Sequence, residues 1–522
     1  MPLLGIDVGT SSLKVVIASE SGEILGEGVS EYPVSRPCSG WTEQDPELWW
    51  GALLLALPRA IAAASLRASD IRAVGLSGQM HGSVLLSRAT VESRGVQGAT
   101  IRPALLWNDQ RTASQCERIE SVVGGRRALV ELVGNAALTG FTLPKLLWVR
   151  EHEPELAARI ASFMLPKDYI GFRLTGVCAT DVGDASGTLL LDPEARAWSD
   201  RVLGLFGVER EILPSLHESG EVIGVITRWA AEQLGLNPDT PVIAGSGDNQ
   251  AGAIGAGIVG TGQVLATLGT SGVIYAHADR PRRDAGETRS STGRLHTMCA
   301  ADGTKSQSGS WSLTGCMLSA AGSLQWARDT IAPGVPFDRL IDEASSVEPC
   351  ARGLLFMPHL AGERCPYPDP AARGAWIGLT ARHTRAHLIR AVIEGITMTM
   401  AQILDIVRGA GVEVRSVRLG GGGARSRFWR ELQADLYGVP VATTNTEQGP
   451  AFGAAMLAGV GIGVWPDVAS AASVCVHESE RIEPEPVRAQ RYSPAREAFA
   501  GLHAGLQDTF RSLGDIDRDS QA

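Results

Sequence analysis

The sequence predicts an α/β protein built from two related halves that close on a ligand between them. Strand-like and helix-like segments alternate along its 522 residues, which is typical of α/β proteins. Two similar turns, Gly9-Thr10-Ser11 and Gly269-Thr270-Ser271, each follow an apolar strand-like run and lie about half a chain apart. No low-complexity segment separates the halves, so we expect them to share a substantial interface.

The first half opens with three expected strands, at residues 3–7, 13–19 and 23–30. The first turn therefore joins two antiparallel strands, unlike a Walker loop or a dinucleotide fold, where the turn leads into a helix. Asp45 is expected to cap a helix that has Pro46 in its first position and runs to Ala64. Residues 71–76, 103–107 and 241–245 are further expected strands.

The second half repeats this opening, with expected strands at residues 263–267 and 272–277 on either side of the second turn. Helices are expected at about 313–331 and 383–407, and a strand at 415–419 runs into the glycine run 420–423. A helix from Ser426, a strand at 439–443 and a helix from Gly449 follow. We expect domains at residues 1–256 and 257–510, and a polar tail at 511–522.

Composition restricts the class of protein. The net charge of −10 disfavours a nucleic-acid partner, because a protein that reads a phosphate backbone normally carries a basic face. The sequence suggests no apolar run long enough to span a bilayer and no signal peptide. The eight cysteines are scattered without a zinc-like spacing, so we expect reduced thiols in a cytoplasmic protein. The oligomeric state stays open, with a homodimer among the possibilities.

The paired turns suggest a site for a polyphosphate. Glycine lets the backbone approach a ligand closely, while N–H and hydroxyl groups supply hydrogen-bond donors. Asp7 stands just before the first turn, where it could meet the metal ion of the polyphosphate. Lysine is scarce, with only four in the chain, and Lys14 beside the first turn is one of them. A need for an ammonium group there and chance remain equal explanations.

Asp248 carries the strongest catalytic signal. A carboxylate at a strand end, preceded by the flexible Gly247, can face a cleft and accept the proton of a sugar hydroxyl. The structural alternative makes Asp248 the cap of the following helix, a common position for aspartate. The neighbouring Gly255-x-Gly257-x-x-Gly260 matches a dinucleotide motif literally but lies well past its strand, so close helix packing explains these glycines better.

Two further strand ends carry polar side chains suited to a neutral sugar. Met80-His81 combines an apolar wall with a hydrogen-bonding imidazole, although His81 could instead bond a neighbouring carbonyl. Trp107 begins a second such segment, in which Asp109 could equally be a helix cap. The glycine run 420–423 suits close approach by a base or ribose, or forms a flexible turn. Residues 447–455 are expected to pack beneath it.

These segments, in this order, resemble the FGGY carbohydrate kinases, a family with the duplicated ribonuclease-H-like fold of actin and hexokinase. The resemblance covers residues 5–459, and within the family it is closest to the kinases of D-xylulose. The motifs that carry it are Gly78-Gln79-Met80-His81-Gly82, Leu105-Leu106-Trp107-Asn108-Asp109, Pro144-Lys145, Leu165-Pro166-Lys167-Asp168-Tyr169, Asp184-Ala185-Ser186-Gly187-Thr188 and Gly421-Gly422-Gly423-Ala424-Arg425-Ser426.

The resemblance implies two domains, each from a βββαβαβα unit, with the active site in the cleft between them. It implies ATP and Mg²⁺ as cofactors and Asp248 as the catalytic base, with Asp7 and Asp248 near the metal. The expected sugar contacts are Met80, His81, Trp107, Asp248 and Asn249. The expected nucleotide contacts are Gly9, Thr10, Ser11, Lys14, Gly269, Thr270, Ser271, Gly421, Gly422, Gly423 and Ser426.

One departure from the family is visible. The usual Gly-Glu-Arg-Thr-Pro segment has Cys365 in place of threonine, which puts fine specificity in doubt but not the reaction. The expected reaction is ATP-dependent phosphorylation of D-xylulose to D-xylulose 5-phosphate. The alternatives are another ketose or polyol, such as ribulose, and a non-catalytic ATP-driven switch of the actin or heat-shock type.

Overall fold

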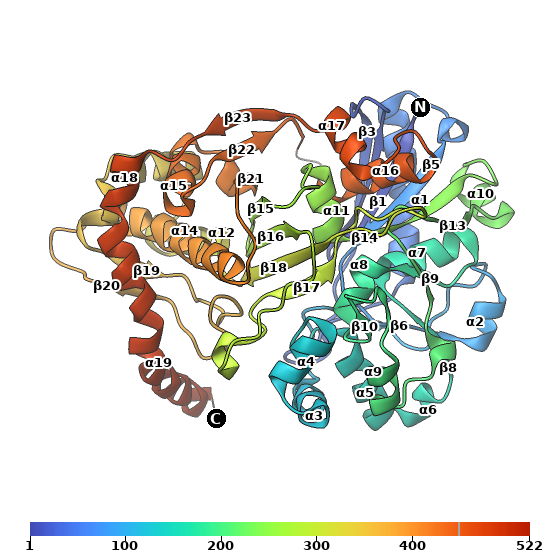
Figure 1. Cartoon of the computed structure of the whole chain (residues 1–522), viewed down its shortest axis with the longest axis horizontal. Coiled ribbons are helices and arrows are strands. Elements are labelled where there is room, and N and C mark those ends of the chain that lie inside the picture. Colours follow the sequence, from blue (N-terminus) through green and yellow to red (C-terminus); the bar gives the residue numbers. More distant parts are fainter. Residues whose placement is uncertain (447–448, 522) are drawn as a thin grey trace.

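The computed structural model describes residues 1–446 and 449–521, which form two lobes that each contain a mixed β-sheet (Figure 1). The first sheet has the strand order β13-β14-β5-β1-β2-β3, and the second has the order β17-β18-β16-β15-β21-β22-β23. The first comprises β1 (Leu3–Val8), β2 (Ser12–Ala18), β3 (Ile24–Glu31), β5 (Ala73–Gly78), β13 (Val222–Val225) and β14 (Pro241–Gly247). The second comprises β15 (Gln263–Leu268), β16 (Gly272–Ala278), β17 (His296–Cys299), β18 (Trp311–Met317), β21 (Ser416–Gly421), β22 (Val441–Thr444) and β23 (Glu478–Ile482).

The two sheets repeat one arrangement. Strand β1 pairs antiparallel with β2 and parallel with β5, and β15 pairs antiparallel with β16 and parallel with β21. The helices that follow corresponding strands are α1 (Glu47–Ala64), α7 (Pro166–Thr175) and α11 (Asp248–Gly255) in the first unit, and α14 (Arg385–Gly409), α15 (Arg427–Tyr437) and α16 (Gly449–Gly461) in the second. The expected duplicated βββαβαβα unit is confirmed.

Insertions enlarge both lobes. Between β5 and β14 lie α2 (Arg88–Glu92), α3 (Ala113–Val123), α4 (Arg126–Val133), α5 (Thr142–His152), α6 (Pro154–Ala157), α8 (Val182–Ala185), α9 (Asp200–Phe206) and α10 (Arg228–Leu234). The short strands are β4 (Glu43–Gln44), β6 (Val84–Ser87), β7 (Ala104–Leu105), β8 (Ile160–Met164), β9 (Ala179–Asp181), β10 (Leu191–Asp192), β11 (Ala197–Trp198), β12 (Ser215–His217), β19 (Leu355–Met357) and β20 (Ala375–Ile377). The second lobe adds α12 (Ala321–Ile331), α13 (Phe337–Ser345), α17 (Val468–Cys475), α18 (Pro486–Arg491) and α19 (Ser493–Gln521).

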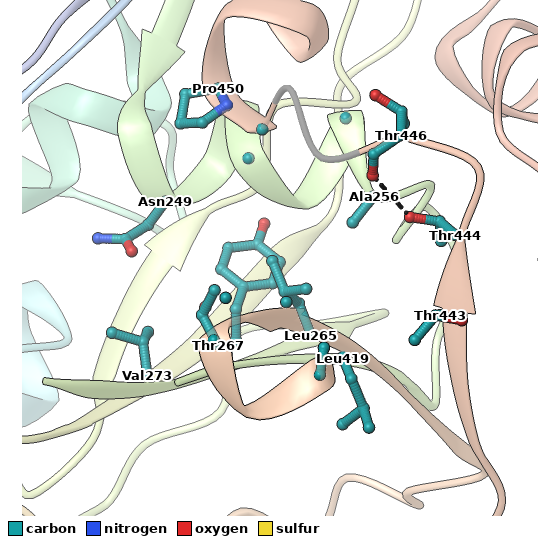
Figure 2. Close-up of a pocket in the computed structure, with 18 of the residues that line it drawn as sticks. Asn249, Ala256, Leu265, Thr267, Val273, Leu419, Thr443, Thr444, Thr446 and Pro450 are labelled. Carbon is teal, nitrogen blue, oxygen red and sulfur yellow. Dashed lines mark hydrogen bonds between the residues drawn. The ribbon is translucent and has the colours of Figure 1, made fainter. Parts of the chain in front are cut away.

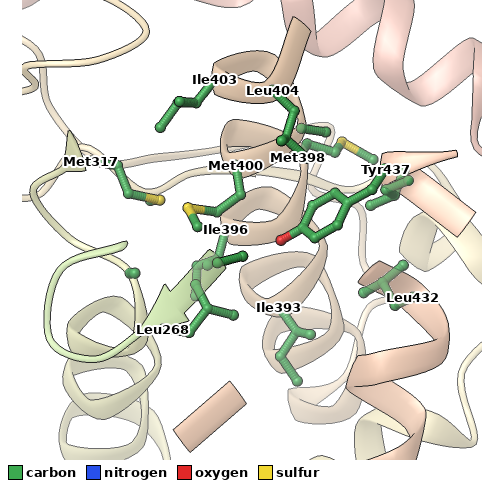
Figure 3. Close-up of a cluster of buried hydrophobic side chains, with 14 of the residues drawn as sticks. Leu268, Met317, Ile393, Ile396, Met398, Met400, Ile403, Leu404, Leu432 and Tyr437 are labelled. Carbon is green, nitrogen blue, oxygen red and sulfur yellow. The ribbon is translucent and has the colours of Figure 1, made fainter. Parts of the chain in front are cut away.

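The core of the second lobe forms around α14 (Figure 3). Ile393, Ile396 and Met400 recur at helical spacing and are fully buried, so one face of α14 packs on the sheet. Leu268 at the end of β15 and Met317 at the end of β18 belong to the same cluster. The end of β15, which leads into the second turn, is therefore fixed by the core.

Helix α16 crosses from one half to the other. A Cβ atom on Gly5 of β1 would lie 1.8 Å from the Ala451 carbonyl oxygen, and one on Gly75 of β5 would lie 1.9 Å from that of Ala454. Only glycine allows this approach, so α16 packs directly on the first sheet, between the lobes (Figure 1). Part of the prediction for residues 447–455 is thus wrong, because α16 packs there instead of beneath the glycine run; Glu447 and Gln448 lie outside the described residues.

Close helix packing also explains Gly255 in the dinucleotide-like motif. A Cβ atom on Gly255 would lie 2.4 Å from the carbonyl oxygen of Gly449, at the start of α16. Helices α11 and α16 therefore touch backbone to backbone, and the preference for packing over dinucleotide binding is confirmed at this glycine.

Three local predictions are wrong. Residues 313–317 belong to strand β18 and not to the helix, which begins only at Ala321. Small residues at alternate positions of β18 hide the strand period, since Thr314 and Cys316 look as compatible with a helix as their neighbours.

The second wrong prediction is the cap of helix α1. The helix begins at Glu47 with Pro46, not Asp45, at the cap position, and Asp45 accepts a hydrogen bond from the Glu47 amide (3.0 Å).

The third wrong prediction is that no apolar run is long enough to span a bilayer. Helix α1 is long and apolar enough to cross a membrane by length and composition alone. Trp49, Leu53, Ala56 and Ala60 are buried along one side, where the helix packs on β2 and β3. This packing is that of a core helix.

Candidate active site

The first turn is held in place by its carbonyl groups. The Gly9 amide donates to the Ser12 carbonyl (3.0 Å), which closes the turn between β1 and β2. The Tyr32 hydroxyl donates to the Gly9 carbonyl (2.6 Å), and the Gln44 amide donates to that of Thr10 (2.8 Å). The Thr10 hydroxyl accepts from the Trp107 indole (3.0 Å), which ties the first turn to a residue expected to contact the sugar.

The second turn has the same construction. The Gly269 amide donates to the Ser271 carbonyl (3.0 Å). The amides of Ala320 and Ala321, at the start of α12, donate to the carbonyls of Thr270 (2.8 Å) and Gly269 (2.9 Å). Both turns are therefore preorganised by neighbouring segments, although those segments differ.

Asp248 lies at the junction of β14 and α11. The pairing of β14 with β5 shifts register between Ile243 and Ser246, and Gly245 in this bulge has φ +66°. A Cβ atom there would lie 1.7 Å from the Leu76 carbonyl oxygen, so the bulge needs glycine. Gly247 occupies the cap position and Asp248 is the first helical residue, so the capping alternative does not describe its role.

Asp7 and Asp248 are two buried carboxyl groups whose pKa values are both raised. Desolvation raises the pKa of Asp248 to about 7, and the charge of Asp7 adds to the increase. Desolvation likewise raises the pKa of Asp7 to about 6, opposed by a hydrogen bond from the Ser77 hydroxyl (3.1 Å) and by Lys14. A carboxylate with a pKa near 7 is matched to general-base catalysis at neutral pH.

The two carboxylates fit the metal requirement of a magnesium-nucleotide site. Among the described residues there is no group of three His, Cys, Asp or Glu side chains arranged around a metal position. Mg²⁺ in phosphoryl-transfer sites is usually held by one or two carboxylates together with phosphate oxygens and water. Asp7 and Asp248 could supply that share, and a cation beside them would relieve the cost of their buried charge.

Lys14 lies on β2 directly opposite Asp7 in the strand register. Its ammonium group pairs with Glu27 of β3 at 3.2 Å. The structure thus places it close to the first turn, with a carboxylate already beside it.

His81 occupies a strained turn beside Met80. Its φ is +67°, and the Gly82 amide donates to the Met80 carbonyl (2.9 Å), so His81 is the central residue of a γ-turn. The His81 carbonyl accepts from the Lys145 ammonium (2.9 Å) and the Thr142 hydroxyl (3.2 Å). Strain of this kind persists where surrounding contacts over-determine it, as at functional sites.

The imidazole of His81 is neutral and oriented. Desolvation lowers its pKa well below the usual value, with nearby cationic groups adding to the effect. Its Nδ1 lies 3.1 Å from the Gly187 carbonyl oxygen, which can only accept, so Nδ1 carries the proton. The alternative of a bond to a carbonyl is therefore correct for Nδ1, while Nε2 is left as an acceptor.

Met80 precedes His81 in sequence and packs against the residue before Asp248. Met80 is buried, and a Cβ atom on Gly247 would lie 2.6 Å from its Cγ. The Asn249 amide lies 3.6 Å from the Met80 sulfur. The structure thus brings together Met80, His81, Asp248 and Asn249, whereas the indole of Trp107 lies against the first turn, where it bonds the Thr10 hydroxyl.

Asp109 is neither a helix cap nor a sugar contact. It is fully buried and accepts hydrogen bonds from the Thr42 amide (2.6 Å) and from the Arg111 guanidinium (2.8 and 2.9 Å). Helix α3 begins only at Ala113. Asp109 therefore anchors the loop that presents Trp107.

Two cavities meet at Gly422 and Arg425. The first, of about 700 Å³, lies between α11 and α16 on one side and the second sheet on the other (Figure 2). Asp248 and Asn249 are among its lining residues. The second, of about 590 Å³, lies beside α12, α13 and α15 and includes Gly269, Thr270 and Ser426.

The glycines of the 420–423 run serve different purposes. Gly421 has φ +75° and Gly423 packs on Leu268, whose Cδ1 would lie 2.4 Å from an added Cβ. Gly422 alone has room, since the nearest atom to an added Cβ is the Leu268 carbonyl oxygen at 3.9 Å. Ser426 caps α15 by accepting from the Trp429 amide (3.4 Å).

The sequence motifs include two lysines, Lys145 and Lys167, to which the sequence analysis assigned no role. Lys145 and Lys167 are fully buried, and Lys167 pairs with Asp168 (2.6 Å) and Asp181 (2.9 Å). Asp181 in turn accepts from the Ser246 hydroxyl (2.7 Å) of β14, two residues before Asp248. The scarcity of lysine was the available signal, but it did not reveal the partners.

Cys365 does not face the ligand cavities. It is fully buried in the core of the second lobe, and a Cβ atom on Gly315 would lie 3.4 Å from its sulfur. The exchange of threonine for cysteine therefore replaces a hydroxyl in the core. All eight cysteines, each within the described ranges, are free thiols.

Known proteins match this chain over nearly its whole length. Residues 2–255 and 264–462 match the N-terminal and C-terminal domains of the FGGY family of carbohydrate kinases. Xylulose kinase of Bacillus subtilis (strain 168) is 37% identical over 98% of both chains. That of Escherichia coli (strain K12) is 39% identical over 96% of this chain and 99% of its own. The ligand-bound xylulose kinase from Lactobacillus acidophilus superimposes with a TM-score of 0.90 at 25% identity, covering 98% of this chain and 99% of its own.

Proposed function

Because the chain belongs to the FGGY family of carbohydrate kinases, we propose that it transfers the γ-phosphoryl group of ATP to D-xylulose, giving D-xylulose 5-phosphate. The xylulose kinases that it resembles along its full length support this choice of sugar. The free thiols suit a cytoplasmic enzyme.

One observation supports the sugar site most strongly. A neutral imidazole with a free Nε2 acceptor lies on the same wall as Met80, which packs against the glycine that precedes Asp248. A neutral, hydroxyl-rich substrate needs such a mixture of an apolar surface and fixed uncharged partners. Charged side chains in this position would favour a different phosphoryl acceptor.

Asp248 acts as the general base in this proposal. It accepts the proton of the C5 hydroxyl as the oxygen attacks the γ-phosphorus, and the bond from that phosphorus to the bridging oxygen of ADP breaks. Its pKa of about 7 keeps a useful fraction ionised at neutral pH while leaving it basic enough to take the proton. Asp7 and Asp248 would hold Mg²⁺, which when bound neutralises charge on the transferring phosphoryl group.

The nucleotide occupies the junction of the two cavities in this proposal. The adenosine lies in the cavity beside α12, α13 and α15, against Gly422 and Ser426, with Gly421 lining the adjoining cavity. The phosphates extend from the turn at Gly269, Thr270 and Ser271 toward the one at Gly9, Thr10 and Ser11 across the cleft. Lobe closure would exclude water from this path and limit hydrolysis of ATP.

Another ketose or a polyol, such as ribulose, is the remaining alternative, since a few side chains decide among family members. The ATP-driven switch is set aside by membership in a family of kinases.

Identification of the product tests the proposal. Incubation with ATP, Mg²⁺ and D-xylulose should give one equivalent each of ADP and a pentulose phosphorylated at O5, which phosphorus NMR distinguishes from other positions. His81→Asn should raise the KM for D-xylulose and leave that for ATP nearly unchanged; asparagine tolerates the left-handed conformation of residue 81. A different product, or equal effects on both KM values, would contradict it.

A further inference from the structure

Strand β17 of the second lobe carries a buried histidine, His296, that the proposed mechanism does not use. His296 pairs with Thr314 of β18, which pairs in turn with Tyr275 of β16. Cross-strand partners share one face of a sheet, and Tyr275 lines the cavity between the lobes, so this face is directed toward the first lobe. Met298 lies on the same face of β17, and its sulfur is 3.2 Å from the side-chain amide of Gln250 on α11.

Phe141 of the first lobe contacts both His296 and His81. Its ring is buried, and the ring centroid lies 4.3 Å from that of the His81 imidazole and 5.4 Å from that of His296. One aromatic side chain thus touches an imidazole from each lobe. Loss of the His296 ring would therefore leave space beside the side chain that supports His81.

Asn135 fixes the position of His296. Its side chain is fully buried, and its oxygen accepts a hydrogen bond from Nδ1 of His296 (3.1 Å). Its amide nitrogen donates to the carbonyl of Thr297 in the second lobe (3.1 Å). The same nitrogen donates to the carbonyls of Val133 (3.2 Å) and Ser186 (3.4 Å) in the first lobe. The Asn135 side chain thus joins β17 to the first lobe with both its donor and its acceptor engaged.

Strand β17 also holds the segment that orients the His81 imidazole. The Gly187 carbonyl accepts the proton of His81 Nδ1 (3.1 Å), and a Cβ atom on Gly187 would lie 2.3 Å from the imidazole ring. The hydroxyl of the preceding residue, Ser186, accepts from the Cys299 amide of β17 (3.0 Å). Contacts from β17 therefore reach His81 by two routes, through Phe141 to its ring and through Ser186 to the carbonyl that bonds Nδ1.

We propose that His296 is a positioning residue of the second lobe, which together with Asn135 holds His81 in the orientation that binds the sugar. This inference rests on the proposed function, in which the His81 imidazole contacts D-xylulose. A binding group that is held in place before the ligand arrives need not be ordered on binding, which favours affinity. The affinity of the first lobe for the sugar would thus depend on a strand of the second lobe.

A double-mutant cycle with His81→Asn tests this. We expect His296→Ala to raise the KM for D-xylulose about tenfold, because small displacements of a positioned group are costly. The KM for ATP should stay within about threefold of wild type. In the His81→Asn background the positioned imidazole is absent, so His296→Ala should change the KM for D-xylulose by less than about threefold. His296→Phe keeps an aromatic ring against Phe141 but loses the hydrogen bond to Asn135, so its effect should be intermediate.

His277 provides the matched control. It is a buried histidine of the same sheet, on β16, and its Nε2 lies 3.0 Å from the Asp302 carboxylate. His277→Ala should leave the KM for D-xylulose near the wild-type value. If His296→Ala fails to fold, the cycle with His81→Asn is measured with His296→Phe and with Phe141→Leu, under the same criterion.

The cycle separates positioning from an independent role. If the effects of His296→Ala and His81→Asn on the KM for D-xylulose multiply, His296 acts independently of His81 and the inference is overturned. An unchanged KM for D-xylulose in His296→Ala, or an equal increase for ATP, would also overturn it. Failure of the wild type to phosphorylate D-xylulose would instead overturn the proposed function, so the two failures are distinguishable.

Discussion

The buried ammonium of Lys145 donates a hydrogen bond to the main-chain carbonyl of His81 at 2.9 Å. It reaches the central residue of a γ-turn, whose positive φ holds the imidazole against Gly187. Desolvation lowers the pKa of Lys145 well below its ordinary value, with Asp109 opposing the decrease. Lys145 therefore supports the backbone of His81, which belongs to the proposed sugar site.

Lys145→Met should raise the KM for D-xylulose about tenfold or more, because small displacements of a positioned group are costly. The KM for ATP should stay near the wild-type value. Thr142 still donates to the same carbonyl, so the variant should fold. Lys305→Met, at an exposed lysine of the second lobe, is the matched control. Steady-state kinetics with each substrate varied in turn measures both KM values. An unchanged KM for D-xylulose would show that Lys145 does not position His81 for sugar binding.

Asp248→Asn should lower kcat by roughly 10²–10⁴-fold while ATP binding is retained, because the amide cannot accept the proton. The same variant should be more stable than wild type at pH 8. The folded-state pKa of Asp248 is about 7 and the ordinary value is 3.8, so ionisation of this group costs wild-type stability progressively as the pH rises from about 4 to 7.

The difference in free energy of unfolding between Asp248→Asn and the wild type should therefore grow between pH 4 and 7 and stay constant above pH 7. Thermal unfolding at several pH values measures this, and we expect an increase in Tm on the order of a few degrees at pH 8. A variant with near-normal turnover would exclude Asp248 as the base. A variant less stable than wild type at every pH would point to a structural role.

The pH dependence of catalysis should follow the same carboxylate. Only ionised Asp248 accepts a proton, so kcat/KM for D-xylulose should fall about tenfold per pH unit below its pKa. The midpoint should lie at or below about 7, since a cation near Asp7 would favour the ionised form. Desolvation lowers the pKa of His81 well below its ordinary value, so this imidazole should not add a transition near neutral pH. A profile that is flat from pH 5 to 8 would contradict this assignment.

Gly422 offers a direct test of the nucleotide site. A valine side chain there meets nothing closer than 3.9 Å at its Cβ, so Gly422→Val should fold but fill the junction of the two cavities. Calorimetry should show weakened ATP binding. Gly409→Val, where an added Cβ meets no atom within 4 Å, is the control. Gly423→Val is less informative, because Leu268 would be displaced whether or not ATP binds there. Unchanged ATP affinity in Gly422→Val would mean that the adenosine binds elsewhere.

The sequence predicted the elements whose signals are local. The two turns, the strands around them and the position of Asp248 at a strand end follow from glycine, hydroxyl and apolar patterns within a few residues. Strand β18 was mistaken for helix because its alternate residues are small and weakly polar. The crossing of α16 onto the first sheet depends on Gly5 and Gly75, about 375 to 450 residues away in sequence, and no local pattern reports such pairing.

The support residues were hidden for the same reason. Lys145 and Lys167 were visible as rare lysines, but their partners His81 and Asp181 come from other segments that only the fold brings together. The protonated nitrogen of His81 depends on Gly187, which is also distant in sequence.

The choice of sugar is the central claim, and competition between epimers tests it most directly. ADP formation should be measured in a coupled assay with D-xylulose, with D-ribulose, which differs only in the configuration at C3, and without sugar. The account predicts the highest kcat/KM for D-xylulose and little ADP without sugar. A higher kcat/KM for D-ribulose, or ADP release that no sugar stimulates, would contradict it.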